Sequence, residues 1–174
     1  MTADRAGTPF PPAVPPLKMP AAVSSPDYRP VLDTNIVLDC FVFRDPAMHA
    51  LVDAMERGRI RPLIHEETLD ELRRVLAYPQ CKLEQIEQHH VLARYRAVAM
   101  EAPMPENFSR AQLALPQGFP KCRDPDDDLF LALAFHARAD ALITKDRALL
   151  KLRRKARKFD VTILGSIDLK ELRW

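Results

Sequence analysis

DPDDDLFLALAFHARADALITKD, residues 124–146, is the stretch of sequence from which the fold can be deduced. Its acidic residues and proline suit a helix start, because the first N–H groups of a helix lack partners. We therefore predict a helix over residues 126–138, capped by Asp124 and apolar on nearly every side. A buried strand follows at 141–144, and Asp146 begins a helix over 146–157. Helix, buried strand and helix in succession are typical of an α/β domain.

The same alternation extends over the chain from residue 30. We predict strands at 30–33, 61–64, 100–102 and within 159–164. We predict helices at 35–43, 46–57, 66–78, 83–99 and 166–172, the last capped by Ser166. Residues 103–123 should form a proline-rich loop. The predicted fold class is α/β with a parallel sheet.

Length and composition fit one soluble domain with an added tail. The 174 residues are 47% hydrophobic and 29% charged. Eight of the 16 prolines lie in residues 1–30, so we interpret residues 1–29 as a flexible tail and residues 30–174 as the domain. The sequence has no apolar run long enough for a membrane span and no secretion signal, and we expect a cytoplasmic protein.

The cysteines and the basic residues say less about function. The three cysteines, at positions 40, 81 and 122, are far apart, and we expect neither a disulfide framework nor a zinc site. The net charge is only +2, but residues 145–158 are densely basic. Such a run can attract a phosphate backbone or can simply be a solvated helix face. The candidate phosphate contacts are Lys145, Arg147, Lys151 and Arg154.

Two aspartates follow predicted strands. Asp33 ends the strand at 30–33, and Asp146 follows the strand at 141–144. Functional sites of open α/β sheets form at the carboxyl ends of the strands. A single aspartate there is more often a helix cap, but two at separate strand ends suggest a shared role.

Two further acids lie on predicted helices. Glu71 falls at the border of the apolar face of its helix, although an exposed glutamate is the simpler interpretation. The helix dipole explains Asp124, Asp126 and Asp127, whereas Asp128 lies a turn further in, at the rim of the core. Several carboxylates held together favour a hard cation, Mg²⁺ or Mn²⁺, and such a site can cleave phosphodiesters.

These residues resemble the four acidic motifs of PIN-domain nucleases. The motifs are Asp33-Thr34-Asn35 after a strand, Glu71 in a helix, Asp128 before an apolar helix, and Thr144-Lys145-Asp146 after a strand. The spacing of 18 residues from Asp128 to Asp146 resembles the family's usual interval. Residues 122–128 resemble a subgroup of VapC-like toxins of toxin–antitoxin pairs. The resemblance covers about residues 30–174, but the proline-rich tail and residues 103–121 have no counterpart in it.

The resemblance implies a three-layer α/β/α fold and a Mg²⁺- or Mn²⁺-dependent endoribonuclease that hydrolyses single-stranded RNA, with an antitoxin as partner. By motif matching, the catalytic and metal-binding acids are Asp33, Glu71, Asp128 and Asp146. The residues that support them are Asn35 and Thr144, and Asp127 is an alternative or a helper to Asp128.

Other interpretations stay open at this point. A HAD-like, Mg²⁺-dependent phosphohydrolase also has an early aspartate, but Asn35 stands where that family has its second acid. A PIN-like module that binds RNA or protein without cutting is a second alternative. The helices at 46–57 and 83–99 could build a homodimer or an antitoxin groove, although core packing is the commoner use of such faces. We expect the five histidines to be solvated or structural.

Overall fold

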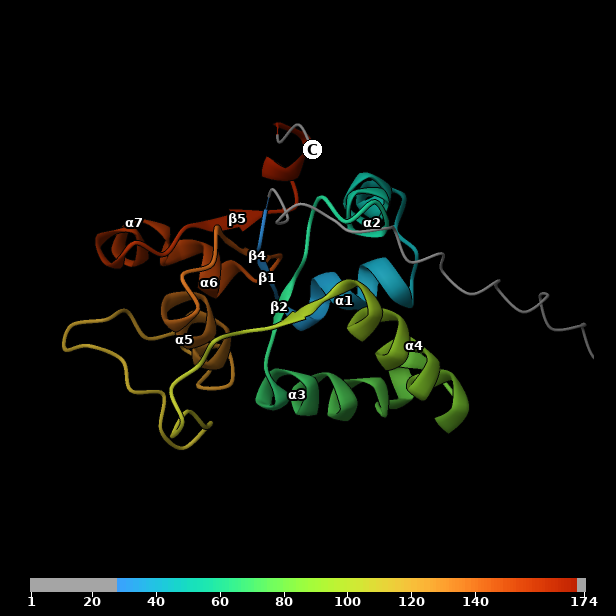
Figure 1. The fold of residues 1–174 in the computed structure, drawn as a ribbon, viewed down its shortest axis with the longest axis horizontal. Helices are drawn as coiled ribbons and strands as arrows, with labels where there is room; N and C mark the ends of the chain where they lie inside the picture. The colour runs from blue at the N-terminus through green and yellow to red at the C-terminus, as the bar shows by residue number, and fades with distance from the viewer. Residues whose placement is uncertain (1–27, 172–174) are drawn as a thin grey trace, which may run out of the picture.

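Short parallel strands form the centre of the computed structural model, which describes residues 28–171 (Figure 1). One sheet has the order β1 (Val31–Leu32), β4 (Leu142–Thr144) and β5 (Ile163–Gly165), and a second pairs β2 (Leu63–Ile64) with β3 (Met100–Glu101). Each of these pairings is parallel. The N–H of Leu63 donates to the carbonyl of Pro30 at 2.7 Å, which joins β2 to the start of β1.

Helices connect the strands, as predicted. The α-helices are α1 (Thr34–Phe41), α2 (His49–Glu56), α3 (Glu66–Leu76), α4 (Gln85–Val98), α5 (Asp128–His136), α6 (Arg147–Lys151) and α7 (Arg153–Ala156). Short 3-10 helices occur at η1 (Pro46–Met48), η2 (Pro79–Cys81), η3 (Arg157–Phe159) and η4 (Asp168–Glu171).

The strands separate two hydrophobic cores. Successive strand residues point to opposite faces. Leu32 and Ile143 therefore pack with α1 to α4, whereas Val31 and Leu142 pack with α5 to α7. Figure 1 shows the two groups of helices on either side of the strands. The predicted three-layer α/β/α fold with a parallel centre is confirmed.

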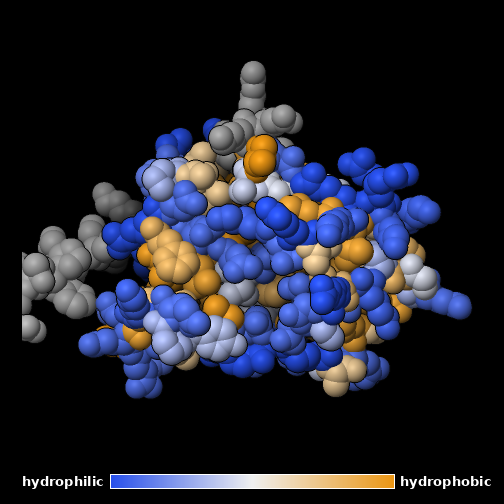
Figure 2. Space-filling view, turned by 180° about the vertical axis from the view of Figure 1, so that it is seen from behind, coloured by the Kyte–Doolittle hydropathy of each residue, from blue (hydrophilic) through white to orange (hydrophobic). Residues whose placement is uncertain are grey.

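Helices α2 and α4 contribute to the first of these cores. Leu51 and Met55 of α2 and Val91 and Tyr95 of α4 are buried within it. These apolar residues therefore serve core packing, the commoner of the two uses that we considered. On the face shown in Figure 2, hydrophilic side chains predominate and hydrophobic ones lie in separate small groups.

Helix α5 is apolar on nearly every side, as predicted, but begins later than predicted. Its residues from Leu129 to Ala134 are all buried. The predicted start at residue 126 and the N-cap at Asp124 are wrong, because residues 124–127 form a turn. The N–H of Asp126 donates to Asp124 Oδ1 at 3.0 Å, and the N–H of Asp127 donates to the Asp124 carbonyl at 3.2 Å. The N-cap position of α5 is Asp127.

The predicted helix over 146–157 is interrupted at Leu152, which separates α6 from α7. The N–H of Leu152 donates to the Leu149 carbonyl at 2.9 Å, a tightened turn that ends α6. Arg153 pairs with Asp168, which also accepts a hydrogen bond from the N–H of Gly165 at 2.7 Å. This contact holds α7 against the end of β5. The predicted last helix is shorter, the 3-10 helix η4.

The segment between β3 and α5 lacks long regular elements, as predicted, and Phe108 anchors it. This side chain is 6% exposed, and its ring lies 5.0 Å from the ring of His65 and 5.9 Å from that of His136. The ring of His136 also contacts the carbonyl of Leu113 at 2.8 Å. Both histidines therefore have structural contacts.

The predicted tail lies almost wholly outside the described residues. Of its residues, Tyr28 and Arg29 are described, and both make backbone hydrogen bonds with the domain. The N–H of Tyr28 donates to the Arg59 carbonyl, and the N–H of Asp140 donates to the Arg29 carbonyl, both at 3.1 Å. Among residues 28–171, no helix has the length and apolar character that crossing a membrane requires.

Candidate active site

Asp33 lies in a buried position at the carboxyl end of β1. Because β1 and β4 are parallel neighbours, Thr144 at the end of β4 lies beside it, and Thr144 Oγ1 donates to Asp33 Oδ2 at 2.6 Å. Asp33 is 3% exposed and Thr144 is fully buried. Burial raises the pKa of Asp33, and the charge of Asp146 raises it further, while hydrogen bonds from Thr144 and Asn35 oppose the shift. Asn35 itself is exposed, at the start of α1.

Asp146 follows β4 and caps α6. Its Oδ1 accepts hydrogen bonds from the N–H groups of Ala148 at 2.6 Å and Leu149 at 3.0 Å. Its own N–H donates to Thr144 Oγ1 at 2.9 Å, so one hydroxyl connects Asp33 to Asp146. Within residues 28–171 no side chain or N–H donates to Asp146 Oδ2, which leaves that oxygen available for another partner.

Asp127 faces the other two aspartates. Burial raises the pKa of Asp127 to about 6, and the charges of Asp33 and Asp146 add to the shift, while the Cys122 thiol opposes it. We call Asp33, Asp127 and Asp146 the acid cluster. Thr144 Oγ1 bonds to Asp33 and to the N–H of Asp146, one oxygen of Asp127 lies within 4.8 Å of one oxygen of Asp146, and the charges of Asp33 and Asp146 both act on Asp127.

Asp128 has a different contact. Its Oδ1 accepts a hydrogen bond from the N–H of Cys122 at 2.6 Å, and the residue is 9% exposed. Burial raises the pKa of Asp128, and the Cys122 N–H opposes this shift. Asp128 is the first residue of α5, rather than a turn further in, and its carboxylate holds the preceding segment.

Cys122 lies at the edge of the acid cluster, although no sequence motif marks it as a functional thiol. Its Sγ donates to Asp127 Oδ2 at 3.3 Å. One ligand atom from each of Cys122, Asp127 and Asp146 lies within 4.8 Å of the others. The only available signal was that Cys122 lies two residues before the acidic run, which starts at Asp124.

Glu71 is paired with two arginines. It is on α3 with its side chain 16% exposed, and its Oε2 accepts from Arg74 and, at 2.9 Å, from Arg110 Nη2. Arg110 also pairs with Asp126, the neighbour of Asp127. Arg110 therefore connects Glu71 to the turn that carries Asp127. This arginine lies in a segment without a recognisable motif, and we did not single it out from the sequence.

The basic run does not neutralise the acid cluster. Lys145, although it lies between Thr144 and Asp146, pairs with Asp39 of α1 at 2.7 Å and approaches Asp45 at 3.9 Å. The other candidate phosphate contacts are all exposed, Arg147 and Lys151 on α6 and Arg154 on α7. The cluster is thus an uncompensated group of acids with cations on the adjacent helices.

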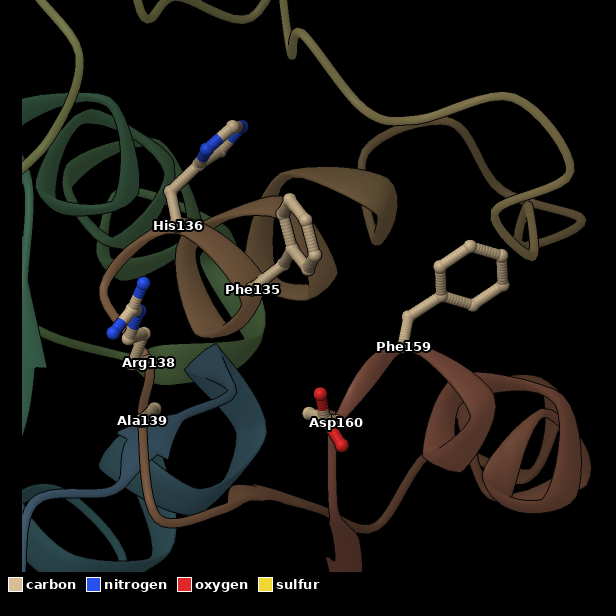
Figure 3. Close-up of a pocket in the computed structure, with 6 residues that line it drawn as sticks. All are labelled: Phe135, His136, Arg138, Ala139, Phe159 and Asp160. Carbon is tan, nitrogen blue, oxygen red and sulfur yellow. The ribbon is translucent and has the colours of Figure 1, made fainter.

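A pocket lies at the opposite end of α5 from the acids. It has a volume of about 670 Å³ and lies between the end of α5 and the turn that precedes β5. Figure 3 shows Phe135 on α5 and Phe159 at the end of η3, with Arg138 and Asp160 below them. Because these residues precede β4 and β5 while the acids follow β1 and β4, the pocket is separate from the acid cluster.

Comparison with known proteins identifies the family. A family model described as the PIN domain matches residues 29–148, a range that contains the whole acid cluster and also residues 103–121. A search of curated proteins finds no match. PIN domains are generally nucleases that act on nucleic acids with divalent metal ions, and the donor set here is suited to such an ion. Since the match spans well over half of the sequence, the chain belongs to the PIN-domain family.

Proposed function

We propose that this protein is a Mg²⁺- or Mn²⁺-dependent endoribonuclease that cuts single-stranded RNA at the acid cluster. The convergence of Asp33, Asp127 and Asp146 supports this proposal. Burial, with added repulsion from Asp33 and Asp146, raises the pKa of Asp127 to about 6, so the protein alone stabilises the ionised cluster poorly. A bound cation would remove that penalty.

The donor chemistry fits a hard divalent ion. Carboxylate oxygens are the ligands that Mg²⁺ and Mn²⁺ prefer. The nearest lysine in the sequence, Lys145, is engaged by Asp39. We propose Asp33, Asp127 and Asp146 as the metal-binding acids, with Asp128 holding Cys122 in place and Glu71 as the fourth acid.

The chain's own residues orient the proposed ligands. Thr144 fixes one oxygen of Asp33, and the N-terminus of α6 fixes Asp146 Oδ1. Ligands held in this way lose little freedom when they bind an ion. The ion itself would stabilise negative charge on the phosphate and activate water for attack. We propose that Glu71 becomes available when Arg74 and Arg110 both move to another anion, such as the phosphate of the substrate.

The choice of single-stranded RNA rests on the resemblance described above and on the basic helices. Arg147 follows Asp146 directly, and Lys151 and Arg154 lie on the next turns. Cations there would contact the RNA backbone next to the acids. We further propose that the protein is the toxin of a toxin–antitoxin pair, because residues 122–128 resemble VapC-like toxins. Sequencing the adjacent reading frames and co-expressing the neighbour with this chain tests this narrower proposal.

Cleavage of a mixed pool of single-stranded RNA tests the proposed activity. We expect cleavage with Mn²⁺, none with EDTA, and products with 5′-phosphate ends. Asp33→Asn and Asp146→Asn should abolish cleavage while the circular dichroism spectrum stays unchanged. Asp53→Asn, in an exposed pair with Arg57, is the matched control and should cleave normally.

Parallel arms separate the alternatives. Single-stranded DNA tests the choice of nucleic acid, and a small phosphomonoester tests the HAD-like alternative. RNA binding without cleavage under every metal condition would support the non-catalytic module instead. Full Mn²⁺-dependent activity in both Asn variants would refute the assignment of the acids.

A further inference from the structure

The acid cluster has a sulfur atom at its edge. Cys122 Sγ lies 3.3 Å from Asp127 Oδ2. The sulfur atom, one oxygen of Asp127 and one oxygen of Asp146 all lie within 4.8 Å of one another. Three ligand atoms at this spacing can converge on one cation after small side-chain rotations. The thiol is therefore placed as a ligand would be.

The position of Cys122 is fixed by its backbone. The Cys122 N–H donates to Asp128 Oδ1 at 2.6 Å, and Asp128 is the buried first residue of α5. This contact ties the segment before α5 to the helix that follows the acidic turn. It also gives Asp128 a role that does not require it to bind metal.

The other two cysteines have different surroundings. Cys40 and Cys81 are both buried. Cys40 lies on α1 within the first core, and the Cys81 thiol donates to the Val75 carbonyl at 3.3 Å. Cys122 alone of the three is half-buried. All three lie among the described residues, so a thiolate–metal signal from this protein can be assigned by substitution.

We propose that Cys122 is a direct metal ligand and gives the acid cluster affinity for thiophilic divalent ions such as Zn²⁺ and Cd²⁺. This inference rests on the proposed metal site. Sulfur ligands select such ions, whereas an oxygen-only site favours Mg²⁺ and Mn²⁺. On binding, an Sγ–metal bond forms, the S–H bond breaks, and the proton passes to the buffer.

A mixed sulfur and oxygen site has a specific consequence for metal choice. Zn²⁺ or Cd²⁺ should displace Mn²⁺ from the cluster, because Mn²⁺ gains less from sulfur. Removing the sulfur should weaken Cd²⁺ binding by about 10-fold or more. The same change should affect Mn²⁺ binding much less, so the ratio of the two affinities is the diagnostic quantity.

Cd²⁺ titration of the full-length, untagged protein tests the proposal. The readout is the ultraviolet sulfur-to-metal charge-transfer absorption, which histidine and carboxylate ligands do not produce. We expect the band in the wild type, its loss in Cys122→Ser, and its retention in Cys81→Ser, the matched control. Competition by Cd²⁺ against Mn²⁺, followed by electron paramagnetic resonance of free Mn²⁺, gives the affinity ratio.

The outcomes separate this inference from the proposed function. A wild-type protein that cleaves RNA with Mn²⁺ but shows no charge-transfer band overturns the inference alone. A band that persists in Cys122→Ser also overturns it, because another thiol must then bind the ion. A band that depends on Cys122 in a protein without nuclease activity supports the inference and removes the proposed function.

Discussion

At the scale of single residues, Asp127 and Asp128 are adjacent in sequence but differ in their contacts. Asp127 faces Asp33 and Asp146, whereas Asp128 accepts the N–H of Cys122. We predict that Asp127→Asn weakens Mn²⁺ binding about 10-fold or more. Asp128→Asn keeps an oxygen acceptor for Cys122 and should change Mn²⁺ affinity only a few-fold. Isothermal titration calorimetry measures both, and equal losses in the two variants would contradict our distinction.

The raised pKa of Asp127 predicts a pH-dependent stability of the metal-free protein. Between the ordinary value of 3.8 and about 6, the folded state holds more protons at Asp127 than the unfolded state does. The stabilisation that the protonated Asp127 gives the folded state is therefore complete below pH 3.8 and is lost as the pH rises through about 6. Because this carboxyl is only half-buried, the effect should be on the order of 1 kcal/mol.

Urea denaturation in EDTA measures this difference. The wild type should lose about 1 kcal/mol of its free energy of unfolding when the pH rises from about 5 to about 7, because Asp127 ionises. Asp127→Asn should not show this loss, because Asn does not titrate. Asp53→Asn, at an exposed aspartate outside the acid cluster, serves as the control for general charge effects. A constant difference between Asp127→Asn and the wild type over this range would show that Asp127 does not titrate as proposed.

Membership of the acid cluster could be predicted from the sequence for some residues and not for others. Asp33 and Asp146 could be located because each follows a short apolar strand, and parallel strands bring their carboxyl ends together. The choice between Asp127 and Asp128 could not be made, because it depends on where α5 begins. That start is fixed by the turn at residues 124–127 and by the contact of Asp128 with Cys122, neither of which has a clear sequence signal.

At the scale of elements, the segment between β3 and α5 depends on one aromatic anchor. Phe108 packs on His65 and His136 and is 6% exposed. We predict that Phe108→Ala lowers the free energy of unfolding by about 3 kcal/mol. Phe43→Ala, at a side chain that is 56% exposed, should cost less than about 0.5 kcal/mol. Chemical denaturation measures both variants. Similar losses of the free energy of unfolding in Phe108→Ala and Phe43→Ala would refute the anchoring role of Phe108.

The basic helices α6 and α7 predict a salt-dependent affinity for RNA. Replacing Arg147, Lys151 and Arg154 by Gln should weaken binding and flatten the plot of log affinity against log salt. Its slope should fall by about 0.7 for each phosphate that the variant no longer neutralises.

Arg57→Gln, at the end of α2, is the control, because Arg57 pairs with Asp53 and is not expected to contact RNA. Fluorescence anisotropy with a labelled oligonucleotide, in EDTA to prevent cleavage, measures the slope. An unchanged slope would favour a solvated helix face.

The elements themselves were predictable where hydrophobic periodicity is strong. The helices α3, α4 and α5 and the strands β1 and β4 lie within their predicted ranges. The break at Leu152 was not predicted, because neither the tightened turn there nor the tertiary pair of Arg153 with Asp168 has a signal in the hydrophobic pattern. Arg110 was missed for the same reason, since its contact with Glu71 joins segments that are 39 residues apart.

At the scale of the whole molecule, metal binding should stabilise the fold. An ion that binds only the folded state raises stability by about 2.7 kcal/mol at 100 times its Kd. We predict that saturating Mn²⁺ raises the Tm of the wild type, and that Asp146→Asn abolishes this increase. Differential scanning calorimetry with Mn²⁺ and with EDTA measures it. An equal increase in the variant would mean that Mn²⁺ binds elsewhere.

The position of β4 between β1 and β5 has a consequence for synthesis on the ribosome. Asp33 leaves the exit tunnel early, but its partners Thr144 and Asp146 belong to a strand and turn translated more than a hundred residues later. A nascent chain therefore cannot assemble the acid cluster until the segment through Asp146 has left the exit tunnel. The order of translation thus delays the proposed metal binding until that segment is available to pair with β1.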